Sequence, residues 1–324
     1  MTKIHLTTLI ALSFLTVTPP ATAQVAKPVL IASGSIAGSN YAAAGSMCQL
    51  FNKYQKASVG RSCTVLGTSA STANIEAIRS GEVDFGMGQA DALREAFNGL
   101  DFFKAQGPNK DLRFVFSVNP NYLTLIAAKE ANAQKFEDIK GKRVFAGKEG
   151  SGTLLLFLEL LAAHKMSPSD ITLVTKEVDP NNQGDALCNT KKIDFAFSAL
   201  GLGATAVSSP LKICSAKIIP LIGAGAENML KNSSVDAVEL PANAYPNQPE
   251  SVKTLASPAT IISSTKTSPD LVYALVKSVF DNLPDFKKTH QSFAPIEPKT
   301  MIKYGQVAPI HEGALRYYKE KGWI

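Results

Sequence analysis

Serine, threonine and glycine gather in three short segments, each of which follows an apolar run and precedes a helical pattern. The segments are residues 33–41, 67–75 and 147–153. The first turn of a helix has unpaired backbone N–H groups and a partial positive charge, so hydroxyls and N–H groups there can hold an anion. Three such segments predict a cleft that binds a small polar or anionic ligand, with no cofactor.

The candidate contacts come from all three segments, from the end of the strand near residue 89 and from a polar stretch at 179–182. A plainer interpretation exists for each turn alone, because Gly, Ser and Thr also cap helices and permit tight turns. The repetition of the same chemistry favours a site. The predicted ligand-binding residues are Ser33, Gly34, Ser35, Tyr41, Thr68, Ser69, Ser71, Gln89, Ser151, Gly152, Thr153 and Asn182.

Catalytic and metal chemistry find little support in the sequence. The G-x-S-x-G pattern of a nucleophile elbow is absent, and no histidine follows a strand end with an acid nearby. Only His164, His290 and His311 lie beyond the N-terminal segment, and no CxxC pair exists, so neither a metal site nor an enzyme is predicted. A periplasmic hydrolase is the weakest alternative.

Residues 1–23 have the pattern of a secretory signal peptide. Lys3 precedes a mostly apolar run at 4–17, and Ala21 and Ala23 supply small residues at the −3 and −1 positions. The run is shorter than the ~20 residues of a membrane-spanning helix. We therefore expect cleavage before Gln24 and a periplasmic location.

Charge and cysteine content fit an exported binding protein. The formal net charge is +6, with lysines dispersed along the chain, so no nucleic-acid-binding tract is indicated. Four cysteines in an oxidising compartment permit two disulfides, and pairing of neighbours gives Cys48–Cys63 and Cys188–Cys214. Buried free thiols are the alternative.

Apolar runs alternate with helical patterns, which predicts βα units and a largely parallel sheet in each of two lobes flanked by helices. Long extended stretches at 119–128 and 253–264 could cross between the lobes. The predicted division is lobe I at 24–118 and 264–324, and lobe II at 119–263. Strands are expected at 29–32, 63–66, 85–88, 114–118, 123–128, 143–146, 171–174, 195–198, 218–221 and 259–263, and helices at 41–53 (after a Ser39/Asn40 cap), 71–79, 154–165 and from 269.

Four motifs occur in order between residues 29 and 322. The first joins Ser33-Gly34-Ser35 and Tyr41 to Leu50-Phe51-Asn52-Lys53, and the second comprises Thr68, Ser71, Asn74-Ile75, Gly81-Glu82-Val83-Asp84-Phe85-Gly86, Gln89 and Asp91. The third is Asp138-Ile139-Lys140-Gly141-Lys142-Arg143-Val144 with Gly150-Ser151-Gly152-Thr153, and the fourth is Pro309, His311, Gly313-Ala314, Arg316-Tyr317-Tyr318, Glu320 and Gly322. This set resembles the TAXI family, the solute receptors of TRAP-type transporters.

The resemblance implies an α/β, two-lobed periplasmic-binding-protein fold of type II, with the ligand cleft between the lobes. It also implies hinge closure on a small carboxylate, such as a glutamate-like amino acid or a dicarboxylate, and delivery to a TRAP membrane permease. The sequence departs from the glycine-richer family turns at Ser35, Ser69 and Ala70, which changes the rim of the cleft. An exported immunogenic surface protein without a transport role is the alternative.

Overall fold

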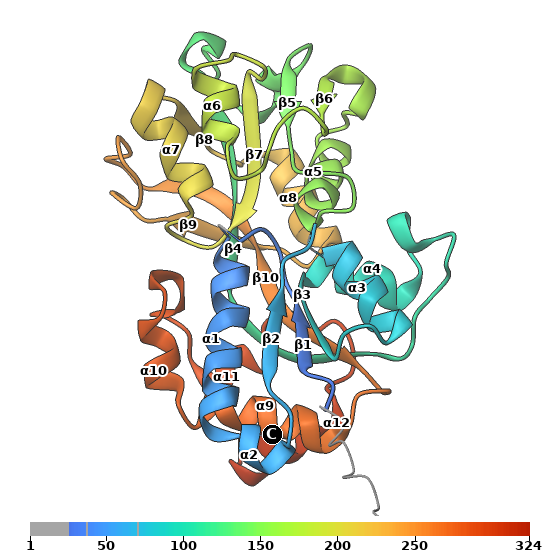
Figure 1. Cartoon of the computed structure of the whole chain (residues 1–324). Helices are drawn as coiled ribbons and strands as arrows, with labels where there is room; N and C mark the ends of the chain where they lie inside the picture. Colours follow the sequence, from blue (N-terminus) through green and yellow to red (C-terminus); the bar gives the residue numbers. More distant parts are fainter. Residues whose placement is uncertain (1–25, 37, 70) are drawn as a thin grey trace, which may run out of the picture.

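A computed structural model describes residues 26–36, 38–69 and 71–324. The predicted signal peptide and its cleavage site therefore lie outside the described residues. Figure 1 shows two parts, one above the other, joined by the long strands β4 and β10. The strands are β1 (Val29–Ala32), β2 (Cys63–Leu66), β3 (Phe85–Gln89), β4 (Leu112–Ala127), β5 (Arg143–Phe145), β6 (Thr172–Val174), β7 (Phe195–Leu200), β8 (Lys217–Ile219), β9 (Asp236–Leu240) and β10 (Val252–Ser264).

All of these strands belong to one mixed sheet in the order β2-β1-β3-β10-β4-β7-β5-β6, with β8 paired to β4 and β9 to β10. The pairs β1–β2, β1–β3, β5–β6 and β5–β7 are parallel, as predicted. The pairs that involve β4 or β10 are antiparallel, which the sequence did not predict. The long strands β4 and β10 pass through both parts, and each runs antiparallel to the other and to the shorter strands beside it.

The long strands change partners along their length. In β4 the residues up to Tyr122 pair with β10, and those from Tyr122 onward pair with β7. In β10 the first residues, from Val252 to Ala256, pair with β9, whereas Ala259 to Ile262 pair with β3. The expected strands at 114–118 and 123–128 are thus one strand, and the polar residues between them lie inside it.

The lower part of Figure 1 has a helical layer on each face of its strands. Successive strand residues point to opposite faces. Ile31 accordingly packs into a core with α1, α9 and α12, whereas Ala32 packs with α3 and α4. The helices of this part are α1 (Ser39–Tyr54), α2 (Lys56–Val59), α3 (Ser71–Ser80), α4 (Ala90–Asn98), α9 (Pro269–Phe280), α10 (Leu283–Lys288), α11 (Pro298–Met301) and α12 (Glu312–Glu320).

The upper part repeats this arrangement with its own two cores. Phe195 and Phe197 pack with α5 and α8, and Ala196 between them packs with α6 and α7. No helix in the described residues is long and apolar enough to cross a membrane. The helices are α5 (Gly152–Ala163), α6 (Gln183–Cys188), α7 (Thr205–Cys214) and α8 (Ala224–Asn232), and short 3₁₀ turns are η1 (Asp101–Phe103), η2 (Lys129–Ala131), η3 (Phe136–Ile139), η4 (Pro168–Asp170) and η5 (Gln291–Phe293).

The predicted cap of the first helix is wrong. The N-cap of α1 is Gly38, and no side chain caps the helix there. Ser39 is already the first helical residue, and its Oγ instead accepts a hydrogen bond from the N–H of Gly201, 3.1 Å away in the upper part. A residue that looks like a local cap in the sequence thus joins the two parts.

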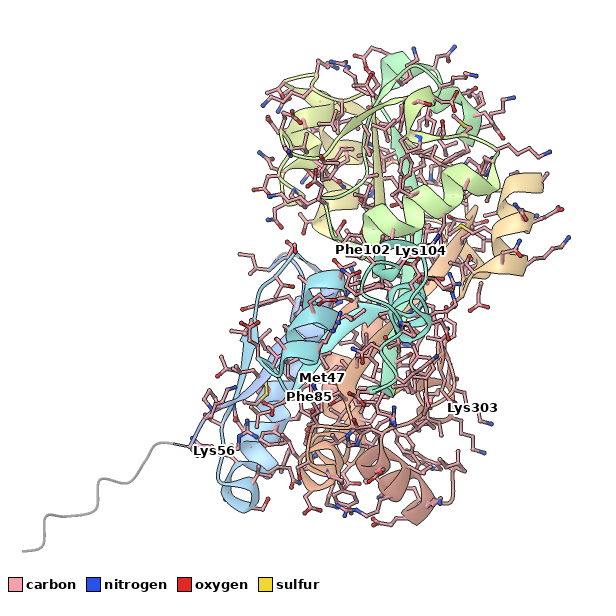
Figure 2. The ribbon with its side chains drawn as sticks, turned by 90° about the vertical axis from the view of Figure 1, so that its right-hand side faces the viewer. Met47, Lys56, Phe85, Phe102, Lys104 and Lys303 are labelled. Atoms are coloured by element: carbon pink, nitrogen blue, oxygen red, sulfur yellow. A yellow bond between two sulfur atoms is a disulfide. The ribbon has the colours of Figure 1, made fainter. Side chains whose placement is uncertain are left out.

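Both predicted disulfides are present. Cys48 of α1 is joined to Cys63 at the start of β2, with Cα atoms 4.9 Å apart. Cys188 at the end of α6 is joined to Cys214 at the end of α7, with Cα atoms 5.5 Å apart. Figure 2 draws the side chains over the ribbon, including the sulfur atoms. Each bridge connects elements of one part, so neither bridge links the two parts.

The disulfides give the first testable expectation. Alkylation of the denatured, non-reduced protein should leave its intact mass unchanged, whereas reduction first should add four alkyl groups. On the chain-entropy model, the Cys48–Cys63 bridge should stabilise the fold by about 3 kcal/mol. Four alkylated thiols without reductant would refute both bridges.

Candidate functional site

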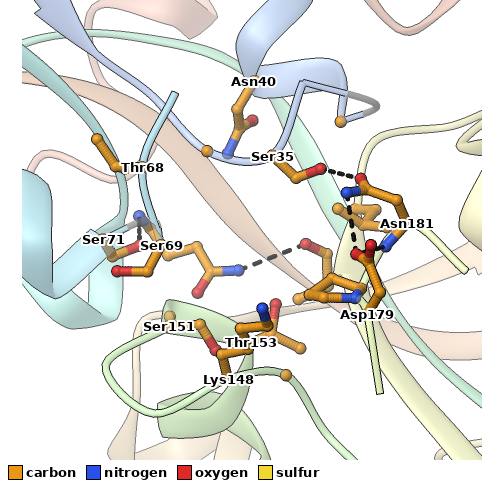
Figure 3. A pocket seen from close by; sticks show the side chains of 18 residues that line it. Ser35, Asn40, Thr68, Ser69, Ser71, Lys148, Ser151, Thr153, Asp179 and Asn181 are labelled. Atoms are coloured by element: carbon orange, nitrogen blue, oxygen red, sulfur yellow. Dashed lines mark hydrogen bonds between the residues drawn. The ribbon is translucent and has the colours of Figure 1, made fainter. Parts of the chain in front are cut away.

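A cavity of about 390 Å³ lies between the two parts, at the carboxyl ends of the strands (Figure 3). Parallel strands bring the loops after their carboxyl ends to one edge of the sheet, which is the usual ligand position in open α/β folds. The lining comes from the segments after β1, β2, β5 and β6 and from the last residues of β3 and β7. It consists of Gly34, Ser35, Gly38, Asn40, Thr68, Ser69, Ser71, Gln89, Gly147, Lys148, Ser151, Gly152, Thr153, Asp179, Pro180, Asn181, Ala199 and Leu200.

The structure brings most of the predicted binding residues together at this cavity. Gly34, Ser35, Thr68, Ser69, Ser71, Gln89, Ser151, Gly152 and Thr153 all line it. Ser33, Tyr41 and Asn182 are not among the lining residues: Ser33 is fully buried, and Asn182 is the N-cap of α6.

Sequence reasoning missed four polar residues of the lining, namely Asn40, Lys148, Asp179 and Asn181. The sequence does contain a signal for two of them, because the polar stretch 179–182 is predicted to border the cleft. The prediction chose Asn182, one residue too far along the chain. Periodicity cannot decide such a choice in a loop, where neighbouring side chains follow no fixed alternation.

The first two turns are held together by a buried asparagine. Asn74, on α3, is fully buried, and its Nδ2 donates to the carbonyl of Ser33 at 2.8 Å and of Met87 at 2.7 Å. The Thr68 hydroxyl donates to the same Ser33 carbonyl and lies 2.6 Å from Asn74 Oδ1. Thr68 therefore fixes the shape of the first turn as well as lining the cavity.

Gln89 is one of the buried polar residues of the lining. Its side chain is 4% exposed, and its Nε2 is 3.5 Å from the carbonyl of Ala199, at the end of β7 (dashed in Figure 3). Its Oε1 is buried and has no partner, and the same holds for Oδ1 of Asn40. A buried amide oxygen without a partner is costly, so both amides are suited to receive a donor from a ligand.

The upper part contributes the start of α5. Ser151 is the N-cap, and its Oγ accepts from the N–H of Leu154 at 3.2 Å. Gly147 has φ +94° and reaches close to Ser151, where a Cβ would lie 2.5 Å from Ser151 Oγ. The turn thus places the first N–H groups of the helix, and the partial positive charge of its N-terminus, beside the cavity.

Gly152 brings α5 against the lower part. A Cβ at this position would lie 2.2 Å from Gln89 Oε1 and 2.4 Å from Ser71 Oγ. Real Cβ atoms do not approach other atoms so closely, so any side chain at 152 would have to displace the buried side chains of Gln89 and Ser71. Glycine is required here for close approach and not for an unusual φ.

Further hydrogen bonds join the two parts around the cavity. The hydroxyl of Thr72 donates to the carbonyl of Gly150, and that of Ser35 donates to Oδ1 of Asn181 (Figure 3). The N–H of Ser234 donates to Asp91 at 2.7 Å. The structure is therefore one in which the two parts are closed on each other.

The lining also includes charged side chains, which lie at its exposed rim. The charged lining residues are Lys148 and Asp179, both exposed. Asp179 Oδ1 accepts from the N–H of Asn181 at 2.9 Å and from its Nδ2 at 3.0 Å. The interior offers hydroxyls, amides and helix N–H groups, a set that suits reversible binding of a small polar solute and contains no nucleophile paired with a base.

Comparison with solved structures supports the predicted fold. A protein from Bordetella bronchiseptica RB50 matches with a TM-score of 0.55 at 12% identity, over 91% of this chain and 98% of its own. A protein from Listeria monocytogenes, provisionally named an L-cystine ABC transporter, matches with a TM-score of 0.50 at 10% identity, over 82% and 95%. The alkanesulfonate-binding protein SsuA from Xanthomonas axonopodis pv. citri, bound to MOPS, reaches 0.48 at 16% identity, over 92% of each chain.

At these identities the matches inform the fold alone. The α/β architecture of type II periplasmic binding proteins, predicted from the sequence, is confirmed. A family model matches residues 31–322, which include both parts and every turn that lines the cavity. The chain therefore belongs to the NMT1-like family.

Proposed function

We propose that this protein is an extracytoplasmic solute receptor that captures a small carboxylate between two lobes and delivers it to a membrane permease. The observation that carries the proposal is the cavity between the two parts, lined by the starts of helices from both. The proposed lobes are 24–118 with 264–324, and 119–263, and the proposed location is the periplasm, after cleavage before Gln24.

The chemistry of the lining supports an anionic ligand. Helix starts after β1, β2 and β5 offer N–H groups, and Ser69, Thr153 and Ser71 offer hydroxyls at the same cavity. Neutral donors can solvate a carboxylate without burying a second charge, and Lys148 at the rim adds attraction for an anion. The volume of about 390 Å³ is at the lower end for small-molecule sites, which favours a compact solute.

Asp179 favours an amino acid over a dicarboxylate. Its carboxylate is at the same rim as Lys148, so the lining holds one group for a negative charge and one for a positive charge. An α-amino acid satisfies both, because its ammonium group can pair with Asp179, whereas a dicarboxylate without an ammonium group offers Asp179 no partner. We therefore infer a glutamate-like amino acid as the preferred ligand within the carboxylate class.

The type of permease is inferred from the motifs. The solute turns, the Gly81-Glu82-Val83-Asp84 lead-in and the C-terminal motif resemble the TAXI receptors of TRAP-type transporters. The family match is coarser than this assignment, and one of the structural matches is named for an ABC transporter. A TRAP permease encoded beside this protein would support the assignment, and an ABC permease there would replace it.

Titration calorimetry against a panel tests the ligand class. L-glutamate or a related amino acid should bind more tightly than succinate, and sugars and inorganic phosphate should give no heat of binding. Tight binding of a sugar or an oligopeptide, with no response to any carboxylate, would overturn the proposed function and leave the fold unaffected.

Two substitutions test the predicted contacts. Thr153→Ala should weaken binding about three- to tenfold, the range for loss of one neutral hydrogen bond. Thr64→Ala, at an exposed position of β2 outside the lining, is the matched control and should bind as the parent protein does.

Asp179→Asn should weaken amino-acid binding by about tenfold or more, since it removes a charged partner. The same substitution should leave the affinity for a dicarboxylate unchanged. If Asp179→Asn weakened the binding of the amino acid and of the dicarboxylate equally, the proposed contact between Asp179 and the ammonium group would be refuted.

Gly152→Ala tests the closed arrangement of the lobes. The added methyl group would collide with Gln89 and Ser71, so the lobes should separate while each keeps its own core. Hydrogen exchange should accelerate at the N–H groups of Gly201 and Ser234, which are bonded across the lobes, by about tenfold or more for a loss of 1.4 kcal/mol.

The matched control is Gly45→Ala on α1, where a Cβ meets nothing within 4 Å. This variant should leave exchange at both amides unchanged. Unchanged exchange in Gly152→Ala as well would show that the close contact at Gly152 does not govern the arrangement of the lobes.

A further inference from the structure

Two glutamates face each other across the boundary between the lobes, away from the cavity lining. Glu95 belongs to α4 in the lower part and Glu159 to α5 in the upper part, and these two helices are in contact. One carboxylate oxygen of each, together with one of Asp101, all lie within 4.8 Å of one another. Figure 1 shows α4 beside the lower end of α5, and Figure 2 places Phe102, the neighbour of Asp101, at the same boundary.

The hydrogen bonds of this pair are incomplete. Glu159 Oε1 accepts from Arg94 at 2.7 Å, but Oε2 of Glu159 and Oε2 of Glu95 are buried and have no donor. Glu95 as a whole is 1% exposed. Two ionised carboxylates at this spacing would repel each other and leave both oxygens unpaired, which is costly in a buried position.

The surrounding charges make the carboxyl pair a strong acceptor of positive charge. Asp91 and Arg94 on α4 and Asp101 on η1 act on both glutamates. Asp91 is itself held by the N–H of Ser234 and the hydroxyl of Ser257, each at 2.7 Å. Arg94 supplies one positive charge against these carboxylates, and it is engaged by Glu159.

Burial raises the pKa of Glu95 to about 8, and the neighbouring charge of Glu159 contributes in the same direction. Burial also raises the pKa of Glu159 to about 7, with Asp91 adding to the effect and Arg94 opposing it. One oxygen of each carboxyl group lies within 4.8 Å of one of the other, so a charge on one group raises the pKa of the other. The two groups therefore titrate as a pair.

We propose that Glu95 and Glu159 form a proton-binding site between the lobes, which takes up one proton when the lobes close. The shared proton completes the pairing: one carboxyl donates to the other, while Arg94 neutralises the acceptor. When the lobes open, both carboxyls are solvated and release the proton. The proton site itself does not depend on the proposed function. Only the link between proton uptake and ligand affinity rests on it, because that link requires the ligand to close the lobes.

The direction of the pH effect follows from the raised pKa values. In the open form each carboxyl should titrate near its ordinary value of 4.5, whereas the closed form keeps its proton up to about 8. Proton binding therefore stabilises the closed form fully below pH 4.5, and this stabilisation is lost as the pH rises through about 8. Ligand affinity should therefore fall with rising pH, by up to about tenfold per unit, and level off above pH 8.

A bound divalent cation is the competing occupant of this place. Acidic side chains are the ligands that Ca²⁺ prefers, but the guanidinium of Arg94 binds Glu159 and would repel a metal at the same position. A proton can bind without displacing Arg94, because it needs only the unpaired Oε2 atoms of Glu95 and Glu159. The structure thus favours the proton, and the experiment below distinguishes the two.

The first arm measures proton uptake during binding of L-glutamate. Calorimetry between pH 6 and 8, in buffers with different ionisation enthalpies, should show uptake of about one proton and an affinity that falls with pH. Glu95→Gln, whose amide can donate to Glu159 without a titrating proton, should bind with no pH dependence. Glu250→Gln, at an exposed position, is the control and should keep the pH dependence. Binding without proton uptake in the parent protein would refute the proposal.

The second arm needs no ligand, so it separates this proposal from the proposed function. Ser35 and Asn181 contact each other across the cavity, and cysteines at both positions can be oxidised to lock the lobes. Burial raises the pKa of Asp91 as well, so the locked Glu95→Gln variant is the reference spectrum. The difference between the locked parent protein and this reference should show the infrared band of a protonated carboxyl group at pH 7 and lose it above pH 9. No such band at pH 7 would overturn the proposal, and so would a band that Ca²⁺ abolishes at pH 7.

Discussion

The close approach of α5 to the lower lobe at Gly152 is the constraint on which the site depends. A Cβ at this residue would lie 2.2 Å from Gln89 Oε1 and 2.4 Å from Ser71 Oγ, so a larger residue fits only if these side chains move. The contact brings the start of α5 to the turns after β2 and β3, so that donors from both lobes reach one small space. The cavity exists because the two parts of the structure meet there, and neither part contains it alone.

Other hydrogen bonds fix the turns that line the cavity and the distance between the two parts. The first two turns are fixed to each other by Asn74 and Thr68 before any ligand arrives, so their donors are preorganised. Bonds across the lobes, such as Ser39 to Gly201 and Asp91 to Ser234, then set how far the lobes approach. Preorganised donors within each part and hydrogen bonds between the parts are what the proposed receptor would need in order to capture a solute and release it.

The sequence predicted the parts of the site that follow from local rules. Turns rich in Gly and Ser at strand ends located Ser71, Gln89 and Gly152, because each lies at a fixed step from the end of a strand or the start of a helix. The same rules failed for Asn182, in a loop without periodicity, and for Ser39, whose partner Gly201 is 162 residues away. A hydrogen bond between distant segments leaves no pattern in the residues next to it.

The fold shows the same division. Short parallel strands such as β1 and β2 were predicted at their observed bounds, since apolar runs flanked by turns define them. The single strand β4 is predicted as two apolar runs, because Asn119, Pro120 and Asn121 interrupt the apolar pattern within an extended stretch. Their pairing partners on β10 come from a segment more than a hundred residues later, and only that pairing makes the polar stretch a strand.

Small-angle X-ray scattering with and without the tightest-binding carboxylate tests the central claim most directly. The account predicts a larger radius of gyration for the ligand-free protein and, at saturating ligand, a profile that matches the closed structure described here. An identical profile in both states, with the ligand shown to be bound, would contradict capture by closure of two lobes.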